Sequence, residues 1–189
     1  MTRNPTQVVI VVTTSRKEAE NDSELKEFFE CRETAESLRN TKRIESISAE
    51  DVAAVVLIGG HGCLIDFPNC EGLHKLCSNV WYRSEGVLGA IAQGSVGLAY
   101  MKNDRGEPFL KNKKITCMSN EEEKSFKEEL PFYVEEKMEQ LGVQVENQQA
   151  FKPNVIVDSQ RLITAQNPQS SRQFADKLHQ TIRQYAEKV

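Results

Sequence analysis

The chain has 189 residues, enough for a substantial core, and we expect one domain over residues 1–189. Its formal net charge of −4 argues against nucleic-acid binding, because basic residues alternate with acidic ones instead of gathering on one face. No apolar run approaches the ~20 residues of a membrane span, and residues 1–5 lead into a strand instead of a signal peptide, so we expect a soluble, cytoplasmic protein.

The first part of the chain predicts two buried strands and one helix. Residues 7–13 form a continuous β-branched run, which is typical of a strand covered on both faces in a parallel sheet. Apolar residues at helical spacing predict one amphipathic helix over residues 23–39. Residues 52–58 predict a second buried strand, which ends in the Gly-Gly-His-Gly sequence of residues 59–62, where backbone N–H groups can approach a ligand.

Residues 87–98 predict a strand, a tight turn and a helix in direct succession. In α/β enzymes this arrangement is an elbow that carries the nucleophile over the N-terminus of a helix. Here the apex is Ala92 and the next residue is Gln93. Neither side chain can act as a nucleophile or a general base, so the architecture of a catalytic site is present without its chemistry.

The remaining elements alternate between helix and strand. Residues 119–122 have the Ser-x-x-Glu form of a capping box, which predicts a helix start. Together the elements indicate an α/β fold with a parallel sheet and helices on both faces. Further helices are predicted at residues 72–83, 131–141 and 170–188, and further strands at residues 114–118, 143–145, 155–157 and 162–164.

Four motifs, in order, resemble those of the ThiJ/PfpI superfamily, and more narrowly its branch of stress-inducible glyoxalases and chaperones. They are the glycine loop at residues 59–62, the elbow, the acidic turn at residues 119–123, and the Thr-Ala-Gln-Asn-Pro-Gln-Ser-Ser sequence at residues 164–171. The resemblance runs from about residue 25 to the C-terminus. It implies a flavodoxin-like sheet of the class I glutamine amidotransferase type.

The chain departs from the family pattern at the residues that carry the chemistry. Ala92 stands where the family has cysteine, and Gln93 where it has histidine. The interval between the first two strands has room for one helix, so an edge strand and a helix of the family are missing, together with the glutamate that bonds the family's cysteine. Without that strand, the run from Val8 to Val12 becomes a sheet edge without charge or proline. An identical subunit, a partner protein or residues 16–21 could cover it.

Several residues remain candidates for a site. The resemblance places the family's third catalytic residue at Glu121 or Glu122, although a carboxylate there also suits a helix cap. Cys63 follows the glycine loop and is the one thiol placed to replace the missing nucleophile, against the alternative of a buried packing residue. Gly60, His61, Gly62, Gln166, Asn167 and Ser170 could border a small ligand, or Ser170 could only cap the last helix.

No set of residues has convincing spacing for a metal, since His61 and Asp66 lack a third ligand, and we expect no cofactor. Five cysteines without paired spacing indicate free thiols. The joint loss of cysteine, histidine and glutamate favours a non-catalytic binding or structural subunit of a homo- or hetero-oligomer. The alternatives are a glutathione-independent glyoxalase or deglycase acting on small carbonyls such as methylglyoxal, and a holdase-type stress chaperone.

Overall fold

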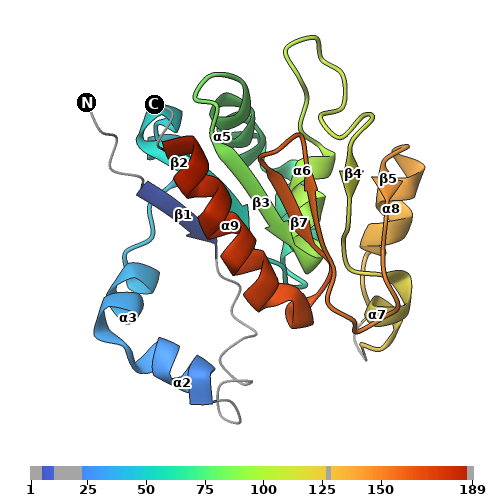
Figure 1. The fold of residues 1–189 in the computed structure, drawn as a ribbon, viewed down its shortest axis with the longest axis horizontal. Helices are drawn as coiled ribbons and strands as arrows, with labels where there is room; N and C mark the ends of the chain where they lie inside the picture. Colours follow the sequence, from blue (N-terminus) through green and yellow to red (C-terminus); the bar gives the residue numbers. More distant parts are fainter. Residues whose placement is uncertain (1–5, 11–22, 127–128, 187–189) are drawn as a thin grey trace.

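The computed structural model describes residues 6–10, 23–126 and 129–186. Its centre is a five-stranded sheet in the order β1-β2-β3-β7-β6, in which all neighbours are parallel except β6 and β7 (Figure 1). The predicted α/β fold with a mainly parallel sheet is confirmed. The strands are β1 (Thr6–Ile10), β2 (Val52–Leu57), β3 (Val87–Ile91), β6 (Val155–Asp158) and β7 (Leu162–Ala165).

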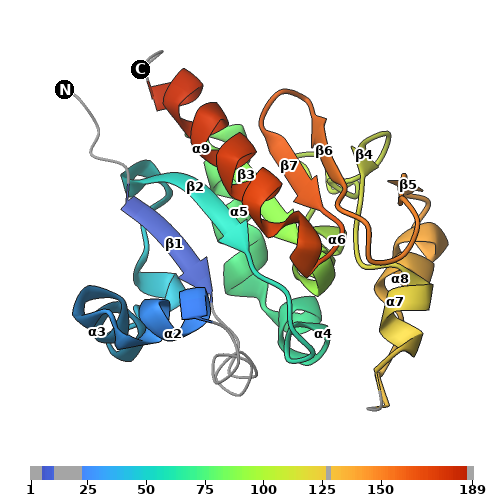
Figure 2. The same ribbon diagram turned by 60° about the horizontal axis from the view of Figure 1, so that its bottom comes forward.

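Helices cover both faces of this sheet. On one face α9 (Ser171–Ala186) crosses β3 and β7, and on the other α5 (Glu71–Tyr82) packs against β2 and β3 (Figure 2). A small residue in the central strand permits this packing, because a Cβ atom on Gly89 would lie 3.0 Å from the Phe174 ring. Other helices are α2 (Ser23–Glu30), α3 (Arg32–Arg39), α4 (Cys63–Asp66), α6 (Val96–Ala99), α7 (Asn120–Lys124) and α8 (Val134–Gln140).

A smaller unit lies beside β6. It contains the short parallel strands β4 (Lys114–Ile115) and β5 (Gln144–Val145). The helices α7 and α8 belong to the same unit, and α8 packs against β5. The predicted capping box is present, since the Ser119 side chain accepts from the Glu122 backbone N–H while the Glu122 carboxylate accepts from the Ser119 backbone N–H. Short 3₁₀ turns occur at Ile44–Ser46, Ala49–Asp51, Phe67–Asn69, Ala92–Ser95 and Pro168–Ser170.

Two sequence predictions are wrong in detail. The single helix expected over residues 23–39 is two helices, because Cys31 is extended (φ −63°, ψ 123°) and separates α2 from α3. The strand at β6 runs antiparallel to β7, since a short reverse turn joins them without a helix. Ser159 and Gln160 in this turn have positive φ angles of 48° and 64°, the conformation that tight hairpin turns require.

The two edges of the sheet differ. Within the described residues β1 pairs with β2 alone. At the opposite edge β6 is covered by β4, whose Lys114 backbone N–H donates to the Asp158 carboxylate at 3.1 Å. Residues 11–22, including the segment at residues 16–21 expected as one possible cover for β1, lie outside the described residues. No described helix is long and apolar enough to cross a membrane.

Candidate functional site

The elbow has the geometry that its sequence predicts. β3 ends at Ile91, a 3₁₀ turn begins at Ala92, and α6 follows from Val96. Ala92 has φ 53°, a strained conformation for a residue with a side chain, and it is almost fully buried. The turn packs so tightly that a Cβ on Gly94 would lie 2.2 Å from the Leu57 carbonyl oxygen. The chain therefore retains a strained nucleophile elbow with a methyl group at its apex.

The glycine loop lies directly against the elbow. A Cβ atom on Gly59 would lie 2.9 Å from the Ala92 Cβ, so the absence of a side chain there permits this contact. Gly60 has φ 150°, in the region that favours glycine. The His61 ring contacts the Phe126 ring edge-to-face, with 4.6 Å between centroids. The loop therefore contacts the elbow through Gly59, and the His61 side chain contacts Phe126.

Gln93 and Glu123 form a buried polar pair beside the apex. Their side chains are 3% and 1% exposed, and Gln93 Nε2 and Glu123 Oε1 have no hydrogen-bond partner within the described residues. No atom pair between the two side chains has hydrogen-bond geometry. The Gln93 amide nevertheless lies close enough to Glu123 to lower the pKa of its carboxyl group. Of the three glutamates in the acidic turn, Glu123 is therefore the one whose carboxylate lies next to the elbow.

Burial raises the pKa of Glu123 from 4.5 to about 7. The Val134 backbone N–H, which donates to Glu123 Oε2 at 2.6 Å, and the Gln93 amide lower the pKa, whereas the nearby charges of Glu135 and Glu122 raise it. Partial desolvation without full hydrogen bonding is the usual origin of such an upward shift in a carboxyl pKa.

One feature of the sequence indicates that Glu123 is buried, although the family motifs do not single it out. In a capping box, the residue after the capping glutamate commonly packs against the residue before the N-cap as an apolar pair. Here those positions are Met118 and Glu123, so a carboxylate occupies a place that is normally apolar and buried. A charged residue at that position indicates a buried acid.

The other two acids have different surroundings. Glu121 is exposed. Glu122 is fully buried, and each of its oxygens accepts several hydrogen bonds. Although burial raises the pKa of Glu122, the hydrogen bonds that its carboxylate accepts outweigh burial and lower it overall. The donors to Glu122 are Ser119 N and Oγ at 2.9 and 2.8 Å, Gln166 Nε2 at 3.2 Å, Asn167 Nδ2 at 2.6 Å and the Phe151 backbone N–H at 2.7 Å.

Gln166, Asn167 and Ser170, which are candidates for binding a small ligand, form hydrogen bonds with other residues of the chain. Gln166 accepts from the Gln148 backbone N–H at 2.8 Å, and Asn167 Nδ2 also donates to the Lys152 carbonyl at 2.8 Å. Ser170 Oγ donates to Asn167 Oδ1 at 2.8 Å and accepts from the Asn154 backbone N–H at 3.0 Å. These side chains fasten the loop before β6 to the end of β7, and they do so as a buried network around Glu122.

Cys63 directly follows the glycine loop, but its thiol is buried and unreactive. Its thiol donates to the Ile58 carbonyl at 3.1 Å, and the residue is 1% exposed. Burial, with a smaller contribution from Asp66, raises the pKa of Cys63 to about 12. The thiol is therefore protonated near neutral pH, and its environment is that of a packing residue. All five cysteines are unpaired.

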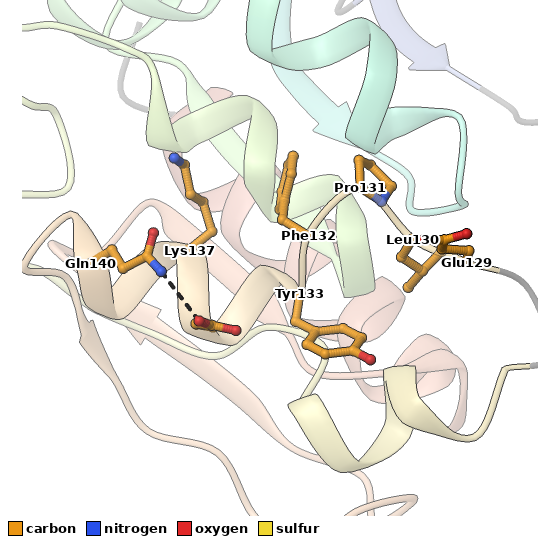
Figure 3. A pocket seen from close by; sticks show the side chains of 8 residues that line it. Glu129, Leu130, Pro131, Phe132, Tyr133, Lys137 and Gln140 are labelled. Atoms are coloured by element: carbon orange, nitrogen blue, oxygen red, sulfur yellow. Dashed lines mark hydrogen bonds between the residues drawn. The ribbon is translucent and has the colours of Figure 1, made fainter.

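No cluster of three or more His, Cys, Asp or Glu side chains in the described part of the chain could hold a metal ion. A hollow of about 440 Å³ lies along α8 and the segment before it (Figure 3). It is lined by Glu129, Leu130, Pro131, Phe132, Tyr133, Glu136, Lys137 and Gln140, and it includes no residue of the elbow, the glycine loop or the acidic turn.

The chain matches one family model over most of its length. Residues 3–181 match the model of the DJ-1/PfpI family. The chain is 30% identical over 142 residues to a protein of Schizosaccharomyces pombe named as a probable glutathione-independent glyoxalase, covering 71% of this chain and 63% of that protein. It is 27% identical over 147 residues to glyoxalase 3 of Candida albicans, covering 74% and 62%.

Solved structures show the same fold. The Francisella tularensis rapid encystment protein of 24 kDa superposes with a TM-score of 0.79 at 29% identity, covering 85% of this chain and 72% of that one. Glyoxalase III of Candida albicans superposes with a TM-score of 0.72 at 24% identity, covering 85% and 70%. The chain spans less than two thirds of the length of the curated relatives described above. The match to the family model over nearly the whole chain means that this protein belongs to the DJ-1/PfpI family.

Proposed function

We propose that the protein is a non-catalytic member of the family that acts as a binding or structural subunit. The observation that carries the proposal is Ala92, which occupies the strained apex of an elbow that is otherwise intact. Covalent conversion of an aldehyde at such an elbow requires a nucleophile and a base in contact with it. A methyl group and the Gln93 carboxamide supply neither.

The Cys63 thiol does not compensate for this loss. With a pKa of about 12, the thiolate would be about one part in 10⁵ at pH 7, and the thiol donates a hydrogen bond to the Ile58 carbonyl. His61 contacts Phe126, and the Glu123 carboxylate accepts a hydrogen bond from the Val134 backbone N–H. The retained strain at Ala92 is then a property of the scaffold.

A second candidate function is glyoxalase activity without glutathione. The names of the relatives in Schizosaccharomyces pombe and Candida albicans favour it over the subunit proposal, whereas the elbow residues favour the subunit proposal. For the enzyme to operate here, Cys63 or a bound water would have to replace the elbow nucleophile.

A third candidate, a holdase-type chaperone, would need an extended apolar surface. The large exposed apolar side chains include Ile65 on α4, Phe28 on α2 and Phe151 in the loop before β6, which belong to separate elements. This scatter gives the chaperone candidate less support than the first two.

Turnover of methylglyoxal to lactate by the purified protein separates the first two candidates. The wild type is compared with Cys63→Ser and with Cys77→Ser, a matched change of a second buried cysteine. The subunit proposal predicts lactate formation no faster than with heat-inactivated protein in all three. Turnover in the wild type that Cys63→Ser abolishes and Cys77→Ser retains would overturn the proposal and establish a relocated nucleophile.

A further inference from the structure

Two polar atoms beside the apex of the elbow have complementary chemistry. Gln93 Nε2 is a hydrogen-bond donor, and Glu123 Oε1 accepts a bond when the carboxyl group is ionised or donates one when it is protonated. Both atoms are buried, and neither has a hydrogen-bond partner within the described residues. Buried polar groups nearly always have a partner, because losing hydration without a replacement bond is costly. The two atoms therefore indicate a site for a small polar molecule.

The surrounding elements fix the positions of both side chains. Gln93 belongs to the 3₁₀ turn Ala92–Ser95 that leads into α6. Glu123 lies on α7, and its Oε2 atom accepts from the Val134 backbone N–H at the start of α8 at 2.6 Å. Because α8 packs against both α6 and α7, it holds the elbow and the acidic turn together. The bond to Val134 occupies Oε2 and leaves Oε1 as the oxygen that can bind another molecule.

The molecule that binds there must both donate and accept. Next to an ionised Glu123 it has to accept from Gln93 Nε2 and donate to Glu123 Oε1, and next to a protonated Glu123 it accepts from both. Burial raises the pKa of Glu123 to about 7, so both states occur near neutral pH. A carbonyl compound lacks the donor and an ammonium ion lacks the acceptor, whereas an O–H group has both.

The burial of the site limits the size of that molecule. Ala92, Gln93 and Glu123 are 5%, 3% and 1% exposed. Water is the smallest molecule with an O–H group, and buried waters in proteins typically bind two to four polar groups that otherwise lack partners. The two atoms meet the lower end of that requirement.

We propose that one water molecule is bound between Gln93 Nε2 and Glu123 Oε1 and bridges the elbow to the acidic turn. The water completes the hydrogen bonding of both side chains, which lie close together without bonding to each other. It thereby ties the 3₁₀ turn after β3 to α7. This water site goes beyond the proposed subunit role and does not depend on it.

Magnetic relaxation dispersion of water oxygen nuclei, measured on the full chain, counts the waters that stay bound for longer than the protein tumbles. Gln93→Met should lose one long-lived water, because methionine cannot donate to it. Gln173→Met changes an exposed glutamine on α9 and should lose none. A crystal structure of the wild type near pH 7 provides a test without any variant. It should show an oxygen atom within about 2.7–3.2 Å of both Gln93 Nε2 and Glu123 Oε1.

Two results would overturn the water site. One is an unchanged count of long-lived waters in Gln93→Met, and the other is a crystal structure in which Gln93 and Glu123 bond directly with no oxygen between them. The methylglyoxal assay fails independently. Lactate formation by the wild type would remove the proposed function and leave the water site, whereas a direct bond between Gln93 and Glu123 would remove the water site alone.

Discussion

Glu122 and Glu123 are neighbours in sequence, and both are buried, yet their surroundings are opposite. Both oxygens of Glu122 are fully used by donors from four residues, and its pKa is lowered. Glu123 accepts from the Val134 backbone N–H, its other oxygen has no partner within the described residues, and its pKa is raised to about 7. The difference shows that the number of donors, and not burial alone, decides whether a buried carboxylate remains ionised.

The two glutamates also differ in what they contact. Glu122 joins α7 to the loop before β6 and to the end of β7, so it holds the fold together. Glu123 lies close to Gln93 at the elbow, and within the described residues one of its oxygens has no hydrogen-bond partner. An incompletely hydrogen-bonded carboxyl group of this kind is typical of a catalytic position, and the apex residue of the elbow is Ala92.

The largest effect should follow loss of Glu122. Glu122→Ala would leave buried donors of Ser119, Asn167 and Phe151 without an acceptor, which should lower the free energy of unfolding by about 3–5 kcal/mol. Urea unfolding at pH 7 measures this. A loss below about 1 kcal/mol, close to that of an exposed-site variant, would contradict the role of Glu122 as a hub.

Glu123→Gln should change the pH dependence of stability. Because the pKa of Glu123 is higher in the folded state, folding is favoured most below pH 4.5, and this contribution is lost as the pH rises through about 7. The loss amounts to about 3 kcal/mol. Relative to the wild type, Glu123→Gln should therefore become more stable as the pH is raised from 4.5 to 8.

Comparing wild type and variant isolates Glu123 from other titrating groups. Burial lowers the pKa of His74, which makes stability rise with pH in part of the same range. That contribution is common to both proteins and cancels in their difference. Parallel stability–pH curves for the two proteins, measured by urea unfolding, would show that Glu123 is not abnormally protonated.

A smaller effect is expected for Gln93→Met. The amide of Gln93 favours the ionised form of Glu123, so its removal should move the pH-dependent loss of stability to a higher pH. Because the two side chains do not form a hydrogen bond, the unfolding free energy at pH 8 should fall by less than about 1 kcal/mol. Unfolding at several pH values measures the midpoint, and an unchanged midpoint would place the two side chains out of contact.

The smallest effect is expected at Glu121. Its side chain is exposed, so Glu121→Gln should change the free energy of unfolding by less than about 0.5 kcal/mol at any pH. The variant is the matched control for both neighbours in the same acidic turn. A larger, pH-dependent change would transfer the role of the perturbed acid from Glu123 to Glu121.

Much of the fold follows from local sequence. The apolar run and glycines around Ala92 predict the elbow, and the Ser-x-x-Glu pattern predicts the cap at Ser119, because both depend on neighbouring residues. The extended break at Cys31 and the reversal between β6 and β7 were not predicted. Neither Ser159 nor Gln160 is a residue that ordinarily signals a turn with positive φ.

The candidate site was predicted less completely than the fold. Motif order located the acidic turn, but which of its three glutamates turns toward the elbow depends on the packing of α7 against α8. The bonds from Asn167 and Gln166 to Glu122 span more than 40 residues, and no local pattern encodes them. Residues that were candidates for a ligand rim thus form an internal network.

The most direct test of a retained elbow without its chemistry is the double variant Ala92→Cys, Gln93→His. Lactate formation from methylglyoxal and the rate of iodoacetamide labelling are measured beside the wild type. We expect the thiol introduced at position 92 to be labelled faster than a free cysteine at pH 7, and lactate to form above the wild-type level. No gain in turnover, with a thiol as unreactive as that of Cys63, would mean that the elbow has lost its catalytic geometry as well as its nucleophile.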